Sequence, residues 1–236
     1  MRLRNVAIAA VLTSACGGSA PKTSSADHHE TAHHHHGNHH RFDDAARWSK
    51  VFDDPGRDAW QKPEKVIALM RLEPGMSVAD IGAGTGYFEP HLARAVGEKG
   101  RVLAIDVEPN MVEWMSERAS REGWKTVTPR LGAPDDPKIP DASVTRVLVV
   151  DVWHHIGDRP AYAKKIAQAL APNGAVFIVD FTKEAPHGPP AQLRLAPELI
   201  VGDLEGAGLV DVKIHLPAAT GLPHQYVVEG KKAAAP

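Results

Sequence analysis

The sequence predicts an α/β protein built on a doubly wound, mostly parallel seven-stranded sheet with a C-terminal antiparallel hairpin. Two observations lead to this prediction. From Ser77 onward, short apolar segments alternate with segments of helical periodicity, which is typical of a parallel sheet with helices on both faces. The last two apolar segments are joined by "PAATGLP", which is too short for a helical crossover and favours an antiparallel pair.

The N-terminal residues have the pattern of a secretory signal peptide. Arg2 and Arg4 precede the apolar run "VAIAAVL", and small residues follow. Cys16, the only cysteine, stands where such a segment would be cleaved, which resembles the lipobox of bacterial lipoproteins, although Leu12 lies one place too far from it. We therefore predict a lipoprotein signal peptide over residues 1–16 and a cell-envelope protein anchored by a lipid on Cys16. A cytoplasmic location is the alternative.

Residues 17–40 are predicted to be a disordered tether. They lack large apolar side chains, so they cannot offset the entropy lost on ordering. Eight of the 14 histidines lie in "HHETAHHHHGNHH" (28–40), and such a run can bind zinc, copper or nickel weakly, without the fixed geometry of a catalytic site. A solvated spacer is the other interpretation.

The remaining chain is expected to form a helical segment (41–72) and one domain (73–236). Trp48, Phe52 and Trp60 indicate a pair of short helices that pack on the domain. The expected strands span residues 77–81, 101–106, 126–131, 143–150, 175–180, 209–215 and 225–229. The expected helices span residues 85–96, 110–122, 159–170 and 197–207.

The stretch "VADIGAGTGYF" joins the first strand to the first of these helices. Glycine at such a turn lets the backbone approach a ligand, with the free amides of the helix directed at it. The spacing of Gly82, Gly84 and Gly86 differs from the dinucleotide-binding pattern, because Tyr87 stands where that pattern has its last glycine. An acid at the end of the second strand, Asp106, can bind both hydroxyls of a ribose.

These motifs resemble those of the class I S-adenosylmethionine-dependent methyltransferases of the small-molecule type, which have a Rossmann-like methyltransferase fold. The resemblance covers about residues 63–230, including "VADIGAGTGYF" and "VLAIDVEPNMVEWM". It implies S-adenosyl-L-methionine as cofactor, with Asp80 at its ammonium and Asp106 at its ribose. The other implied cofactor contacts are Gly82, Gly84, Gly86, Val107, Met111, Gly132 and Ala133. For Met111, simple helix packing is an equally good interpretation.

The fourth strand runs into "DVWHHI", where the ligand crevice of a doubly wound sheet opens. We predict Asp151, His154 and His155 as catalytic residues, with one histidine acting as base or orienting the acceptor. Paired histidines at a helix start can equally be structural. Predicted substrate contacts are Tyr87, Trp153 and Arg194, the last because similar enzymes have "GPP" followed by an arginine here. No metal is expected in this site.

The predicted function is methyl transfer to a small-molecule acceptor. A net charge of −2 gives no sign of a nucleic-acid groove. S-adenosylmethionine is made in the cytoplasm, so an exported enzyme would need cofactor supplied outside. The alternative is a non-catalytic envelope protein with this fold that binds a nucleoside-like ligand and sequesters metal through its His-rich tract.

Overall fold

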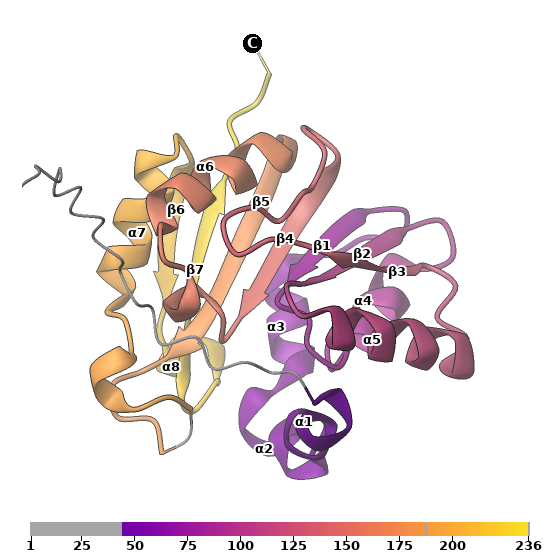
Figure 1. Cartoon of the computed structure of the whole chain (residues 1–236). Coiled ribbons are helices and arrows are strands. Elements are labelled where there is room, and N and C mark those ends of the chain that lie inside the picture. Colours follow the sequence, from indigo (N-terminus) through magenta and orange to yellow (C-terminus); the bar gives the residue numbers. More distant parts are fainter. Residues whose placement is uncertain (1–43, 187, 236) are drawn as a thin grey trace, which may run out of the picture. The chain divides into compact units, whose positions relative to one another are not determined.

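The computed structural model describes residues 44–186 and 188–235. Its seven strands form one sheet in the order β3-β2-β1-β4-β5-β7-β6 (Figure 1). All neighbouring strands are parallel except β5 with β7 and β7 with β6, which confirms the predicted fold class. The strands are β1 (Ser77–Ile81), β2 (Arg101–Asp106), β3 (Val127–Leu131), β4 (Val144–Val150), β5 (Leu170–Phe181), β6 (Val210–His215) and β7 (Gln225–Lys231).

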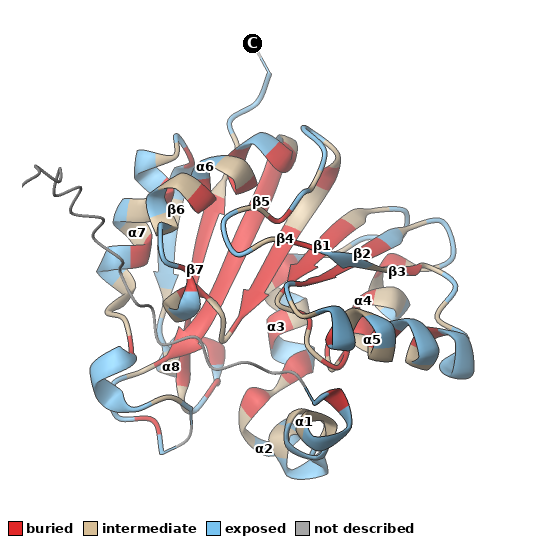
Figure 2. Cartoon of the chain, viewed as in Figure 1, coloured by how far each residue is buried: buried red, intermediate tan, exposed pale blue. Residues whose placement is uncertain are grey.

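Helices cover both faces of the sheet because its strands carry apolar side chains on both sides. Along β1, Val78 packs with one group of buried residues, whereas Ala79 and Ile81 pack with the other. The first group includes residues of α3 (Pro63–Met70), α4 (Glu89–Val96) and α5 (Pro109–Glu122), and the second includes residues of α6 (Arg159–Ala169) and α7 (Pro197–Gly206). Figure 2 shows the burial concentrated in the central strands.

The segment before the sheet contains more helices than the pair that was predicted. It contains α1 (Ala45–Phe52), a short 3-10 turn (Pro55–Arg57) and α2 (Asp58–Gln61), followed by α3. Lys62 separates α2 from α3 with a φ of 49°, in the left-handed region, and a proline begins the next helix. A residue with left-handed backbone cannot continue a right-handed helix, so α2 ends before Lys62 and α3 begins after it.

Two expected elements begin four or five residues away from their predicted starts, and one short helix was not predicted. The helix expected from residue 85 begins at Glu89, because the turns that the glycines make occupy residues 82–88. Strand β5 begins five residues earlier than expected, at Leu170, which pairs with Val144 across a register shift. A short helix, α8 (Pro217–Thr220), lies in the link of the C-terminal hairpin.

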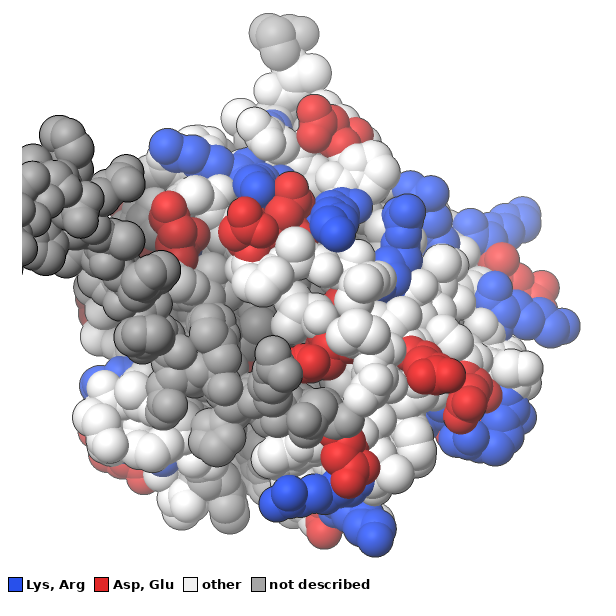
Figure 3. All heavy atoms as spheres, viewed as in Figure 1, with Lys and Arg blue, Asp and Glu red and all other residues white. Residues whose placement is uncertain are grey.

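The predicted signal peptide, the tether and the start of the helical segment (41–43) lie outside the described residues. Within the described part of the chain, no helix is both long and apolar enough to span a bilayer. On the face in Figure 3, basic and acidic side chains are interspersed.

Candidate functional site

Four aspartates end neighbouring strands at one edge of the sheet. Asp80 lies in β1, Asp106 ends β2, Asp151 follows β4 and Asp180 lies near the end of β5. These strands are adjacent and parallel, so their carboxyl ends meet at the same edge. The edge therefore concentrates four carboxyl groups, three of them buried, where ligands of doubly wound sheets bind.

The glycine loop (82–88) passes over this edge in a conformation that only glycine adopts freely. Gly82, Gly84 and Gly86 have φ values of 77°, 59° and 89°. A Cβ on Gly82 would lie 2.3 Å from a methyl carbon of Val152, and one on Gly86 would lie 3.1 Å from the ring of Trp124. The loop thus presents bare backbone, as a cradle for the amino-acid part of a nucleoside cofactor requires.

Asp106 ties the glycine loop to the second strand. Its carboxylate accepts hydrogen bonds from the backbone amides of Gly84 (2.8 Å) and Glu108 (2.9 Å). Burial raises the pKa of Asp106, and the amides counteract this effect. The carboxylate has further acceptor capacity, so its predicted contact with a ribose is compatible with these bonds.

The other predicted cofactor contacts surround the end of β2. Val107 is 46% exposed beside the loop, whereas Met111 is only 1% exposed. Gly132 donates its amide to the Asp106 carbonyl at 2.9 Å, and Ala133 follows it. Met111 therefore packs within the protein as a residue of α5, and its contact with the cofactor remains a prediction.

Asp180 and His154 form a buried pair at the end of β4 and β5. Nδ1 of His154 lies 3.0 Å from both carboxylate oxygens of Asp180, and the two side chains are 3% and 0% exposed. Burial lowers the pKa of His154, but the hydrogen bond and charge of Asp180 outweigh this, so its pKa is raised. The carboxylate fixes the orientation of the ring and leaves Nε2 as the group that can take a proton. His155 is exposed, with its ring 4.2 Å from that of His154.

Asp151 lies beside this pair with an unusual backbone. Its φ is 58°, which is rare for a residue other than glycine, and such strain often marks functional sites. Burial raises the pKa of its carboxyl to about 7. It accepts a hydrogen bond from Gln225 at 2.6 Å and lies 3.9 Å from the guanidinium of Arg57.

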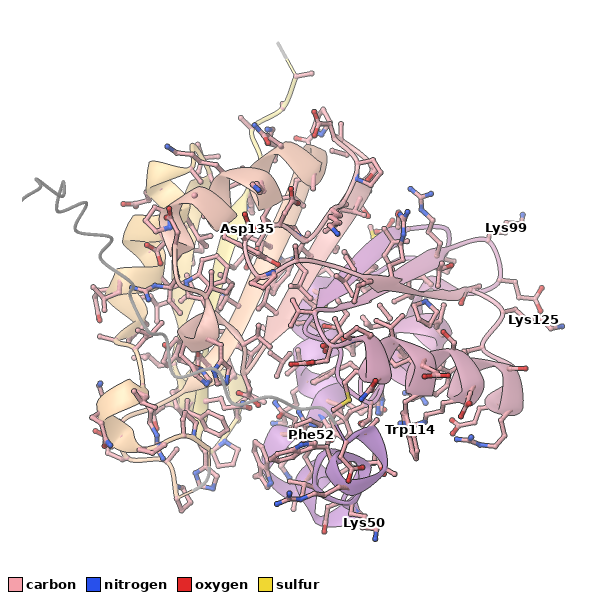
Figure 4. The ribbon with its side chains drawn as sticks, in the orientation of Figure 1. Lys50, Phe52, Lys99, Trp114, Lys125 and Asp135 are labelled. Carbon is pink, nitrogen blue, oxygen red and sulfur yellow. The ribbon has the colours of Figure 1, made fainter. Side chains whose placement is uncertain are left out.

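The helical segment before the sheet covers this edge. The Phe52 ring, labelled in Figure 4, approaches within 3.4 Å of the position that a Cβ on Gly84 would take. Arg57 stacks 4.0 Å above the ring centroid of Tyr87, and the rings of Trp60 and Phe181 are 5.8 Å apart. Aromatic side chains therefore lie beside the predicted site, and Tyr87 is one of them; its contact with a substrate stays a prediction.

Two predicted substrate contacts occupy other positions. Trp153 is 0% exposed in the core, and its indole N–H donates to Asp203 on α7. Arg194 is 7% exposed, and its guanidinium donates to the carbonyls of Pro189, Thr182, Lys183 and Ala185. The structure does not support a substrate contact by either side chain, and Arg194 instead holds its own loop together.

Sequence reasoning missed three contributors to the site. Asp180 ends the apolar run "AVFIVD". An aspartate at the end of an apolar run is the pattern that indicated Asp80 and Asp106, so the sequence could have indicated Asp180 as well. No local sequence pattern indicates Arg57 or Gln225, because only long-range packing brings these two residues to Asp151. Among the described residues, no group of three or more His, Cys, Asp or Glu side chains is placed to hold a metal.

Comparison with known proteins agrees with this geometry. Residues 78–174 match the family model described as a methyltransferase domain. The crystal structure of a SAM-dependent methyltransferase from Aquifex aeolicus superposes with a TM-score of 0.72 at 28% identity, covering 80% of this chain and 98% of that one. Residues 78–174 are thus similar to a methyltransferase domain, and the chain has the Rossmann-like methyltransferase fold.

Two curated relatives are methyltransferases as well. The arsenite methyltransferase of Halobacterium salinarum is 28% identical over 61% of this chain and 36% of its own length. The nocamycin O-methyltransferase of Saccharothrix syringae is 29% identical over 70% of this chain and 56% of its own length. The chain therefore spans about a third to a half of these relatives. These relatives are named as methyltransferases, and the solved structure is named as a SAM-dependent one, so the chain is similar to enzymes of this kind.

Proposed function

We propose that this protein transfers the methyl group of S-adenosylmethionine to a small-molecule acceptor that carries an ionisable proton. The observation that carries the proposal is the Asp180–His154 pair, which lies at the same sheet edge as the glycine cradle. The cofactor supplies a methyl group on a positively charged sulfur. The glycine loop and Asp106 hold it, and the chain's main remaining task is to orient and deprotonate the acceptor.

His154 fits the role of the base. Asp180 fixes the ring through Nδ1, so Nε2 is left to accept the acceptor's proton. The positive charge that then forms on the imidazole lies against a buried carboxylate, which stabilises it. Asp151 adds a second negative charge near the ring.

The side chains at the site limit which class of acceptor molecule it can methylate. The chain's only cysteine is Cys16, so residues 44–235 provide no thiolate for a soft acceptor such as arsenite. An oxygen, nitrogen or carbon acceptor with a proton to lose suits a histidine base better. The aromatic rings of Trp60, Tyr87 and Phe181 favour a flat or apolar molecule.

The test is transfer of labelled methyl from S-adenosylmethionine to arsenite, phenols, quinols and phosphoethanolamine at a series of pH values. We expect transfer to a phenol or quinol, with a rate that rises as pH passes the raised pKa of His154, because only the neutral ring accepts a proton. Asp180→Asn should lower the rate about 100-fold or more and move the rise to lower pH. Cofactor binding without transfer to any acceptor would favour the non-catalytic alternative, which the comparisons do not favour.

We also propose that the chain is anchored to the cell envelope through Cys16, with the His-rich residues 28–40 binding metal weakly. The support is the sequence pattern alone. Detergent-phase partitioning of wild type and Cys16→Ser tests it, since only a lipidated protein enters the detergent phase. Wild-type protein that stays aqueous at full precursor mass would contradict the anchor.

A further inference from the structure

Glu89, the first residue of α4, is a buried carboxyl group beneath the glycine loop. It is 0% exposed, and its Oε2 lies 3.5 Å from the position that a Cβ on Gly86 would take. Neither carboxyl oxygen has a hydrogen-bond partner of ordinary geometry among the described residues, and the same holds for the buried hydroxyl of Thr85 in the loop. Burying such a group without a partner is costly, so native proteins seldom do it without a function.

The position of Glu89 at a helix start does not explain its burial. The amino end of a helix favours a negative charge by about 0.3 to 1 kcal/mol, and it does so for exposed side chains as well. An exposed acid would gain this benefit without losing its hydration. A buried carboxyl here instead points to a partner that enters the site.

The side chain that faces Glu89 is Asp80, which is itself 3% exposed. Burial raises the pKa of Glu89 well above its ordinary value, and the negative charge of Asp80 raises it further. Burial also raises the pKa of Asp80. Two carboxyl groups can hydrogen bond to each other only if one of them holds a proton, so near neutral pH the pair shares one.

The neighbouring cations do not neutralise this pair. Arg118, on α5, donates to Asp53, Glu122 and the Thr85 carbonyl. Arg57, on the segment before the sheet, donates to Gln61 and the Phe52 carbonyl. These guanidinium groups act on the pair only through longer-range attraction, while Asp106, on β2, adds repulsion for Asp80. Within residues 44–186 and 188–235, the two carboxyl groups therefore have no cation in direct contact.

We propose that Asp80 and Glu89 together form the subsite for the ammonium group of the cofactor, and that binding of this ammonium expels the proton that the two carboxyl groups share. This inference rests on the proposed function, because it requires a ligand with the methionine ammonium of S-adenosylmethionine. It assigns to Glu89 a positioning role and makes cofactor binding dependent on pH.

The direction of the pH dependence follows from linkage. The empty pair has a raised pKa and holds a proton, whereas an ammonium beside it favours the fully ionised form. Binding therefore releases a proton, and affinity is highest when the pair is already ionised. Affinity should fall by up to about tenfold per pH unit as the pH drops below neutrality.

The experiment is isothermal titration at pH 6.5 in two buffers with different protonation enthalpies. Two probes are compared: S-adenosylhomocysteine, which carries the ammonium, and 5′-methylthioadenosine, which shares the nucleoside and sulfur but lacks the amino-acid part. We expect wild type to release about 0.5 to 1 proton with the first probe and almost none with the second. Glu89→Gln, a neutral side chain of the same shape, should release fewer protons than wild type with S-adenosylhomocysteine, because only Asp80 is left to hold one, and almost none with 5′-methylthioadenosine. Glu117→Gln, an exposed control on α5, should behave as wild type.

Two results would overturn the inference. One is binding of S-adenosylhomocysteine by wild type without proton release, and the other is equal release with both probes, since the proton would then come from elsewhere. The wild-type comparison decides the matter even if Glu89→Gln does not fold. Failure of wild type to bind S-adenosylhomocysteine at all is a different outcome, which would overturn the proposed function and this inference with it.

Discussion

Gly82→Ala is expected to destabilise the domain by about 2 to 5 kcal/mol. Gly82 has a φ of 77°, where an L side chain is strained, and the new methyl would lie 2.3 Å from Cγ2 of Val152. Valine is branched at Cβ and has few alternative rotamers, so it cannot easily move aside. Urea denaturation followed by circular dichroism measures the loss as a lower transition midpoint.

Gly75→Ala is the matched control. Gly75 has a φ of 93°, but a Cβ there would have no atom within 4 Å. It shares the backbone strain of Gly82 without the close approach, so about 1 to 2 kcal/mol should be lost. Equal losses in the two variants would show that the packing of Val152 against the glycine loop is not tight.

Arg194→Met should cost about 3 to 5 kcal/mol and loosen the loop after β5. The guanidinium is buried and donates to four backbone carbonyls at 2.6 to 3.1 Å. Methionine fills similar space but donates no hydrogen bond, so all four carbonyls lose this donor, and among the described residues only the Thr182 carbonyl keeps another, the backbone amide of Ala185. Urea denaturation gives the stability, and the rate of limited proteolysis within the loop reports its opening.

Arg121→Met is the control for this substitution, because the Arg121 side chain is 61% exposed on α5. It should change stability by less than about 0.5 kcal/mol. If Arg194→Met proved equally mild, the loop would be held by other contacts, and Arg194 would again be a candidate for contact with the substrate.

The fold was largely predictable because its signals are local. Strands β1 and β2 have the expected bounds, since each apolar run is limited by turn residues and has an aspartate as its last or last-but-one residue. The early start of β5 was not predictable, because "PNG" reads as a stop and only the pairing of Leu170 with Val144 extends the strand through it.

Site residues at or directly after strand ends could be predicted from the sequence. Site residues whose position depends on tertiary packing could not. Asp80, Asp106 and His154 lie at the expected edge. Trp153 points into the core, because a single 3-10 turn sends adjacent side chains in different directions and the sequence does not say which. Gln61 donates to Gln225 across 164 residues of sequence, a contact that no local pattern indicates.

We expect the sheet edge formed by the glycine loop and Asp106 to bind S-adenosylmethionine. Isothermal titration of S-adenosylmethionine into wild type and Asp106→Ala tests it most directly, with circular dichroism to confirm that both are folded. One equivalent is expected to bind to wild type. Asp106→Ala should bind about 1.5 to 3 kcal/mol more weakly, a loss of about 10- to 150-fold, because a charge-assisted hydrogen bond to the ribose is removed. Equal affinities would remove Asp106 from the site, and no binding to folded wild type would contradict this expectation.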